Sequence, residues 1–483
     1  MSAAAVFLRH FAALALLCHC APGMAAGAGT LVLSGGGDNS GLWPILFDRL
    51  RDPDAGVVVI TPPGKAADSS RDVEELREIR PAKVKALDAG ASPEAVSATL
   101  AEARMIWLDE GPWAASAALD GPVRQALAAA LDRGALVGGS AGGAKILASA
   151  LADRALFRNI AVFTAANPRK SGEFRKILAA LPDSLCLRVD ASTAVLLRES
   201  DALVVGAGFA RFGSLEGGSP QTSELASGDH FDLAARRPSG RSARGRGAVR
   251  VAIYSGIGTR TQKEAVIHDC LADEKGRFTV AMLDPDEIRH GGLKDFDVLI
   301  QSGGRASEQA EELGDDGRER IREFVRGGGG YVGLNAGSYL AAADRPYYLR
   351  LLNAKVIDRE HWSRGKGKVQ IRFTAEGLHI LGSDSRTAQV QFSNSPLLVR
   401  DAQPDLPSYD ELAIYEDEIF SANDAPQGVM KGASAMEAAP YGEGRVFCSG
   451  PHPAAKDADW KAFLQRAVLW AAGREDTTSS GAF

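Results

Sequence analysis

The chain has 483 residues, of which 45% are hydrophobic and 24% are charged, and its formal net charge is −6. This composition excludes a disordered or low-complexity chain, and the length exceeds that of one ordinary domain, so we expect two domains. The basic residues are mostly scattered along an acidic chain, which argues against a nucleic-acid-binding protein.

The first 28 residues are typical of a secretory signal peptide. Arg9 precedes an apolar run over residues 11–17, and small residues follow at 25–28. The run is too short to span a bilayer, so we expect cleavage near residues 25–28 and a periplasmic or secreted protein without a membrane span in its mature chain. A buried N-terminal helix is the alternative. Lipid anchoring at Cys18 or Cys20 is disfavoured, because the preceding residues are not small.

Three cysteines remain after the predicted signal peptide, and they are far apart: Cys186, Cys270 and Cys448. They form neither a disulfide framework nor a metal-binding spacing, so we interpret them as buried free thiols. The histidines also lack ligand-like spacing. We therefore expect no metal and no cofactor.

An Arg-, Gly- and Ser-rich segment divides the chain into two halves of similar size. Residues 234–250 read AARRPSGRSARGRGAVR and carry no apolar periodicity, which predicts an exposed linker rather than an anion- or nucleic-acid-binding patch. The expected organisation is a domain over 29–235, a linker over 236–248, a second domain over 249–473 and a disordered tail over 474–483.

The two halves share a layout of short apolar strands and helices. Residues 30–38 (TLVLSGGGD) correspond to 249–259, and the mid-domain strand ARMIWLDEG at 103–111 corresponds to FDVLIQSGG at 296–304. In both halves a helical stretch then leads to a second glycine-containing strand. This alternation predicts two tandem doubly wound α/β domains with mostly parallel sheets, of the flavodoxin-like or class I glutamine amidotransferase-like type.

The segment GALVGGSAGGAKIL in the first half has the pattern of a nucleophile elbow. A Gly-x-Ser-x-Gly turn between a strand and a helix exposes its central side chain, and the helix N-terminus faces a developing oxyanion. Ser140 is therefore the candidate nucleophile; a glycine-rich turn used only for close packing is the alternative. The candidate elbow and oxyanion residues are Gly36, Gly37, Gly138, Gly139, Ala141 and Gly142.

With its GGGD, IWLDEG and GGSAGG segments and the later run FRKILAALPDSLCLRVDASTAVLL, the first half resembles the cyanophycinases and related serine dipeptidases. The resemblance implies an amidotransferase-like fold with Ser140 as the nucleophile. Where that family has a His and a Glu, this chain has Asn167 and Ala191. Trp113, after the mid-domain strand, is a candidate pocket residue, whereas Trp107 is expected in the core. Lys145 is expected to be a solvated lysine rather than a replacement base.

The second half resembles the amidotransferase-like N-terminal domain of biotin protein ligases, through VRVAIYSGIGT, VLIQSGG, GGGYVGLNAGSYLAA and GEGRVFCSGPHP. That family has a Cys at the elbow, and a His-Pro-Glu segment near the C-terminus. This chain has Asn335 and His452, with Ala454 in place of the Glu. An amide cannot replace a thiolate, so we expect no covalent chemistry here. The expected pocket residues are Gly303, Gly304, Gly333, Asn335, Gly337 and His452.

Three functions fit this pattern. The first is an exported, degenerate, weakly active or non-catalytic relative of cyanophycinase-type serine peptidases that binds a small molecule, peptide or partner. The second is an active serine hydrolase of peptide or isopeptide bonds that uses Ser140 with a rewired triad; a His or carboxylate within hydrogen-bond reach of the Ser140 hydroxyl would favour it. The third is a structural module that presents an interaction surface. Substitutions at chemical positions in both halves favour the first.

Overall fold

The computed structural model describes residues 29–474, apart from 51, 53–54, 67–68, 81–82, 114–118, 120, 153–158, 165–171, 241–246, 260, 272–275, 420–425 and 452–457. The predicted signal peptide, most of the predicted tail and the central part of the predicted linker lie outside the described residues. None of the helices in the described part of the chain is long and apolar enough to cross a membrane.

The first half is built on a nine-stranded sheet with the order β13-β12-β9-β8-β1-β5-β4-β2-β3. Its parallel strands are β1 (Thr30–Ser34), β2 (Val57–Thr61), β3 (Val84–Asp88), β4 (Met105–Leu108) and β5 (Leu136–Ser140). Its antiparallel extension consists of β8 (Thr193–Arg198), β9 (Asp201–Gly206), β12 (His230–Asp232) and β13 (Arg237–Gly240). The four inner parallel strands, β1, β2, β4 and β5, are buried on both faces, as expected for a sheet covered by helices on both sides, whereas the edge strand β3 is partly exposed.

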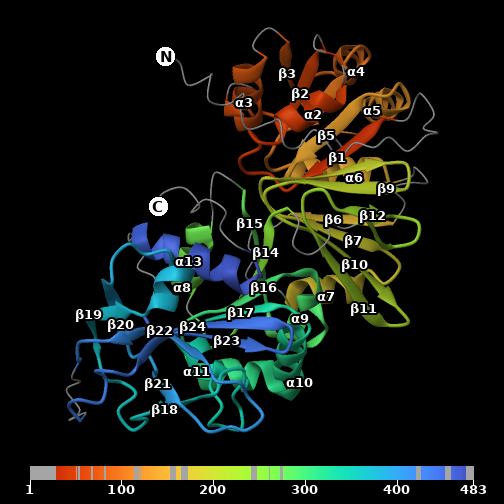
Figure 1. The fold of residues 1–483 in the computed structure, drawn as a ribbon. Coiled ribbons are helices and arrows are strands. Elements are labelled where there is room, and N and C mark those ends of the chain that lie inside the picture. Colours follow the sequence, from red (N-terminus) through yellow and green to blue (C-terminus); the bar gives the residue numbers. More distant parts are fainter. Residues whose placement is uncertain are drawn as a thin grey trace, which may run out of the picture.

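Helices pack on both faces of this sheet (Figure 1). One face is covered by α2 (Trp43–Leu50) and α3 (Arg71–Ile79), and the other by α4 (Pro93–Leu100), α5 (Pro122–Asp132) and α6 (Gly142–Ala150). Local signals fix several helix starts: the Ser70 side chain accepts a hydrogen bond from the Val73 amide, and α5 begins with a proline.

A smaller sheet, with the order β11-β10-β7-β6, completes the first half. It contains β6 (Ile160–Thr164), β7 (Leu185–Val189), β10 (Ala210–Glu216) and β11 (Ser219–Leu225), and α7 (Gly172–Ala180) packs against it. Strands β10 and β11 form a hairpin closed by Gly217 and Gly218, which both have positive φ, the conformation that a two-residue hairpin turn of this kind requires.

The second half is built on an eleven-stranded sheet whose parallel part has the order β15-β14-β16-β17-β24, the flavodoxin-like order. These strands are β14 (Val249–Tyr254), β15 (Phe278–Leu283), β16 (Val298–Gln301), β17 (Gly330–Leu334) and β24 (Gly444–Ser449). The remaining strands pair antiparallel: β18 (Ala354–Ile357), β19 (Lys366–Phe373), β20 (Thr387–Ser393), β21 (Leu397–Arg400), β22 (Asp410–Tyr415) and β23 (Ser434–Tyr441).

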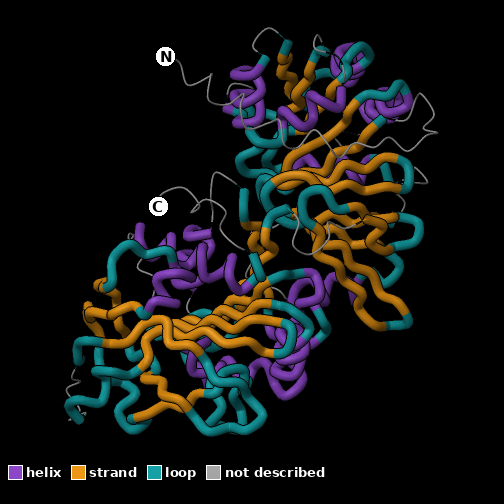
Figure 2. The backbone as a smooth tube through the Cα atoms, in the orientation of Figure 1, coloured by secondary structure: helices purple, strands orange, loops and turns teal. Residues whose placement is uncertain are grey.

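Helices again cover both faces of the second sheet (Figure 2). On one face lie α8 (Thr261–Leu271), α12 (Ala375–Leu381) and α13 (Ala458–Ala471); on the other lie α9 (Pro285–Arg289), the short helix η4 (Gly292–Asp295), α10 (Ala306–Arg326) and α11 (Ala336–Ala341). The predicted doubly wound α/β fold is confirmed in both halves. Each sheet also carries antiparallel strands on one edge, which the prediction omitted.

The structure corrects the strand correspondence between the halves. The sequence comparison paired β1 with β14, because each opens its half and leads into glycines. In the sheets, however, β5 lies between β4 and β1, whereas β17 lies between β16 and β24. Strand β1 therefore occupies the place of β24, and β2 occupies the place of β14. The pairs β4/β16 and β5/β17 agree with the prediction.

The two halves are joined by buried ion pairs and by apolar packing. Arg211 of β10, which is 3% exposed, pairs with Glu224 of β11 and also with Glu287 of α9 in the second half. Phe209 packs against Phe296 with ring centroids 5.3 Å apart. The predicted linker, 236–248, begins inside this ordered region, because residues 237–240 form strand β13.

Candidate functional site

The two glycine-rich elbows have the same geometry, which identifies the apex residue of each. At the first elbow Ala141 has φ 44° and ψ −104°; at the second Asn335 has φ 53° and ψ −96°. The Ala141 amide donates to the Ser34 carbonyl at 2.9 Å, and the Asn335 amide donates to the Ser449 carbonyl at 2.8 Å. Because β1 takes the place of β24, these two hydrogen bonds are equivalent.

The flanking glycines confirm this alignment. A Cβ on Gly139 would lie 2.8 Å from the Gly143 backbone, and a Cβ on Gly333 would lie 2.8 Å from the Gly337 backbone. The first elbow therefore spans 139–143 and the second spans 333–337.

The expectation that Ser140 stands at an elbow apex is corrected by this geometry. The run GGSAGG contains two overlapping Gly-x-x-x-Gly spacings, 138–142 centred on Ser140 and 139–143 centred on Ala141. The turn forms at the second one. Ser140 is the last residue of β5, one position before the apex. Gly138 has a packing role instead, because a Cβ there would lie 2.4 Å from the Trp107 ring.

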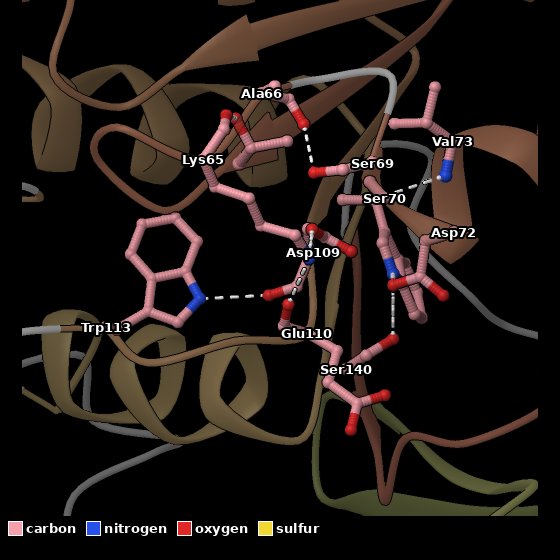
Figure 3. Close-up of polar contacts among 12 residues, drawn as sticks. Lys65, Ala66, Ser69, Ser70, Asp72, Val73, Asp109, Glu110, Trp113 and Ser140 are labelled. Atoms are coloured by element: carbon pink, nitrogen blue, oxygen red, sulfur yellow. Dashed lines mark hydrogen bonds and ion pairs between the residues drawn. The ribbon is translucent and has the colours of Figure 1, made fainter.

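The Ser140 hydroxyl belongs to a buried polar network beneath the sheet edge (Figure 3). It donates to Asp72 Oδ2 at 2.7 Å and accepts from Asn39 Nδ2 at 2.9 Å and from Trp107 Nε1 at 3.0 Å. Asn39 also donates to Asp72 Oδ1 at 2.9 Å, and Trp107 also donates to Asp72 Oδ2 at 2.9 Å. None of these four side chains is more than 1% exposed.

Burial raises the pKa of Asp72 from 3.8 to about 6, and hydrogen bonds from Asn39 and Ser140 partly oppose the rise. The nearby charge of Asp109 adds to the rise. A carboxylate with this pKa, 2.7 Å from a serine hydroxyl, could in chemical terms act as a general base.

Two features of the network oppose nucleophilic chemistry at Ser140. The Asn39 and Trp107 donors occupy the two lone pairs of its oxygen, one of which a nucleophile needs. Ser140 is also 0% exposed, so no substrate carbonyl reaches its oxygen in this conformation. The network therefore behaves as a fully satisfied buried polar cluster, which is the arrangement that stabilises a core.

The space around the Ala141 methyl is formed by the ends of β1 and β4. A Cβ on Gly36 would lie 2.9 Å from the Ala141 Cβ and 3.1 Å from Glu110 Oε2, so only a glycine at 36 leaves this approach open. The Gly37 amide donates to Glu110 Oε2 at 3.1 Å. Gly36 and Gly37 thus face a carboxylate, which is unfavourable for an oxyanion.

Lys65, Asp109 and Trp113 border the same edge (Figure 3). The Lys65 ammonium donates to Asp109 Oδ2 at 2.6 Å and to the Glu110 carbonyl at 2.8 Å. Trp113 Nε1 donates to the Asp109 carbonyl at 2.9 Å, and its ring is partly exposed, as a pocket residue requires. A lysine, a glutamate and an indole therefore lie at this edge, and the lysine is held in an ion pair with Asp109.

At the second elbow the Asn335 side chain is held by its neighbours. Its Nδ2 donates to the Ser393 carbonyl and to Ser395 Oγ, both at 3.1 Å, and the residue is 5% exposed. Its φ of 53° is one that Asn tolerates better than most residues, so the amide preserves the turn without supplying a nucleophile. Gly304 has φ 158° and Gly111, at the equivalent place in the first half, has φ 159°.

The remaining predicted residues are placed as follows. Ala191 is exposed, and a Cβ on Gly37 would lie 3.3 Å from its methyl. Lys145 is exposed, Trp107 is buried, and Cys186, Cys270 and Cys448 are buried free thiols, as expected. Asn167, His452 and Ala454 lie outside the described residues. Among the residues that are described, no three His, Cys, Asp or Glu side chains gather as a metal site would require.

Comparison with known proteins gives one family match, in the second half. Residues 249–361 match the family described as "Biotin-protein ligase, N terminal". A search of curated proteins finds no match. The second half is thus biotin ligase N-terminal-like, and its flavodoxin-like strand order and elbow are those of an amidotransferase-like fold.

Solved structures resemble the chain at low identity. A peptidase from an acI-B1 Actinobacterium is 17% identical with a TM-score of 0.33, and the match covers 43% of this chain and 98% of the peptidase. A putative ThuA-like protein from Parabacteroides merdae is 15% identical with a TM-score of 0.33, covering 49% and 95% of the two chains. One from Bacteroides uniformis is 12% identical with a TM-score of 0.33, covering 48% and 94%.

Asp72 and Asn39 were missed by the sequence analysis. Asn39 directly follows the GGGD segment and could have been suspected as a polar residue at a strand end. Asp72 is 68 residues from Ser140 along the chain, on a helix start where an acidic residue needs no further explanation.

Proposed function

We propose that this chain is an exported, amidotransferase-fold protein that binds a small molecule or peptide without hydrolysing it. One observation carries the proposal: the apex residues of the two elbows are Ala141 and Asn335, which offer no nucleophile. The likeness of the first half to cyanophycinase-type peptidases then reflects a shared scaffold rather than shared chemistry.

The surroundings of Ala141 support binding of a polar ligand. Lys65, which also pairs with Asp109, and Glu110 offer a cation and a carboxylate at the ends of adjacent strands, beside the partly exposed Trp113. Ligands of open α/β sheets bind outside the carboxyl ends of the parallel strands, which is where these three residues lie. A zwitterionic ligand such as an amino acid or a peptide terminus has the charges to match them.

A fluorophosphonate probe tests the absence of hydrolase chemistry. Purified wild-type protein is expected to remain unlabelled, like its Ser140→Ala variant, with circular dichroism to show that both are folded. Labelling of the wild type that disappears in Ser140→Ala would refute the proposal. That outcome would support the second candidate function, a serine hydrolase in which Asp72, 2.7 Å from the Ser140 hydroxyl, acts as the base.

A matched pair of cysteine variants tests which residue is at the apex. Ala141→Cys is expected to react with iodoacetamide well above the wild-type background, because residue 141 is partly exposed, whereas Ser140→Cys is expected to stay near that background. Faster alkylation of Ser140→Cys than of Ala141→Cys would contradict the geometry. Export is tested separately, by N-terminal sequencing of the protein recovered from the periplasm or medium, and an unprocessed cytoplasmic chain would refute it.

A further inference from the structure

A cavity of about 200 Å³ lies where the small sheet of the first half meets the second half. Its lining comes from β7, β10, β11, β12 and β13 and from η4, and it shares no residue with either elbow. The stacked rings of Phe212 and Phe231, with centroids 4.2 Å apart, belong to its buried floor. The cavity is therefore bounded by packed structure from both halves.

The cavity is strongly cationic. Three of its lining residues are basic and one is acidic: Arg236, Arg237 and Lys294 against Glu216. The Arg236 guanidinium donates to the neutral Asp183 carbonyl at 2.9 Å, and it forms no ion pair with any described residue. Within the described part of the chain, no ion pair involves Arg237 or Lys294. An excess of positive charge around a cavity attracts anions.

The backbone places these three basic residues around the cavity. Consecutive residues of a regular strand point to opposite faces, yet Arg236 and Arg237 both line the cavity. Arg236 achieves this as the last residue of the hairpin turn, with φ 50°, a conformation that non-glycine residues rarely adopt. The η4 backbone that carries Lys294 is held against the first half, because the neighbouring Asp295 side chain accepts a hydrogen bond from the Glu224 amide of β11 at 2.8 Å.

The volume and polarity of the cavity limit its ligand. About 200 Å³ is smaller than the ~300–1,000 Å³ typical of drug-sized ligand pockets. Ser214 and Ser223, which lie on the same face of the small sheet as Phe212, add hydroxyls that donate hydrogen bonds to anionic oxygens. We propose that this cavity binds a small dianion, of the phosphate or dicarboxylate class, held by Arg236, Arg237 and Lys294. Because the cations come from both halves, the bound anion would bridge them.

Isothermal titration of the full-length protein with inorganic phosphate and with succinate, at matched ionic strength in chloride buffer, tests the proposal and separates the two ligand classes. At least one probe is expected to bind saturably, and its affinity is expected to fall as salt is raised. Each of Arg237→Gln and Lys294→Gln is expected to weaken that binding roughly tenfold, through loss of one charge-assisted hydrogen bond.

Lys368→Gln is the matched control, because Lys368 is an exposed lysine of β19 that does not line the cavity. The affinity of Lys368→Gln for the probe is expected to equal that of the wild type. Arg237→Gln, Lys294→Gln and Lys368→Gln are all expected to melt at the wild-type temperature, because the altered side chains are exposed. Absence of binding by both probes, or undiminished binding in the Arg237→Gln/Lys294→Gln double variant, would overturn the proposal. Neither result bears on the elbow chemistry, which the fluorophosphonate experiment tests.

Discussion

The buried carboxyl of Asp72 makes a quantitative prediction about stability and pH. Its pKa is about 6 in the folded chain and close to its ordinary value of 3.8 in the unfolded chain. Because the folded-state pKa is the higher one, Asp72 contributes stability that is fully present below pH 3.8 and is lost as the pH rises through 6. A shift of this size corresponds to about 3 kcal/mol of unfolding free energy at neutral pH.

The Asp72→Asn variant removes this titration while keeping the shape of the side chain. The expected result is that the unfolding free energy of the wild type, minus that of Asp72→Asn, falls by about 3 kcal/mol on raising the pH, with most of the fall between pH 4 and 6.5. Subtracting the variant cancels the other carboxyl groups, which titrate in both proteins.

The assay is urea denaturation followed by tryptophan fluorescence at a series of pH values. Trp107, one of six tryptophans, donates directly to Asp72, so part of the fluorescence signal comes from the network. Asp48→Asn, at an exposed position on α2, is the control for removing a carboxylate outside the buried network. A flat difference curve for Asp72→Asn would show that burial does not dominate the pKa of Asp72, and would refute the reasoning.

Three further predictions concern packing and polar satisfaction. Ser140→Ala should reduce the unfolding free energy by about 1–3 kcal/mol, because it removes one donor from a buried carboxylate and an acceptor from two buried donors; an unchanged urea midpoint would contradict the buried network. Gly337→Ala should destabilise the second half by about 2 kcal/mol or more, because its Cβ would lie 2.2 Å from the Gln301 carbonyl; a wild-type melting curve would show that the elbow relaxes freely. Arg211→Met should cost about 3–5 kcal/mol and separate the melting of the two halves in calorimetry, because two glutamates lose their buried partner; a single unshifted transition would show that this ion pair does not couple them.

Much of the architecture could be predicted from local sequence. Apolar runs that enter glycines identified the strands and their carboxyl ends, since a strand buried on both faces must be continuously apolar. The sequence predicts both elbows at the correct strand-to-helix junctions. It also identifies Asn335 as an apex residue, because GLNAG offers a single Gly-x-x-x-Gly spacing at this turn and Asn335 is its centre. These features depend on the residue and its immediate neighbours.

The sequence by itself thus determined the α/β class, the strands and the presence of two elbows, because burial and backbone conformation act on each residue locally. Only the tertiary structure decided which residue of GGSAGG is the apex, since either glycine spacing satisfies a turn. The positive φ of Ala141 identifies the apex, and Gly143 lies against the Leu108 carbonyl as Gly337 lies against the Gln301 carbonyl. The tertiary structure also decided that β1 takes the place of β24, and that Asp72 meets Ser140 across 68 residues. Strand order and long-range contacts depend on how whole layers pack, so they cannot be predicted from any local stretch of sequence.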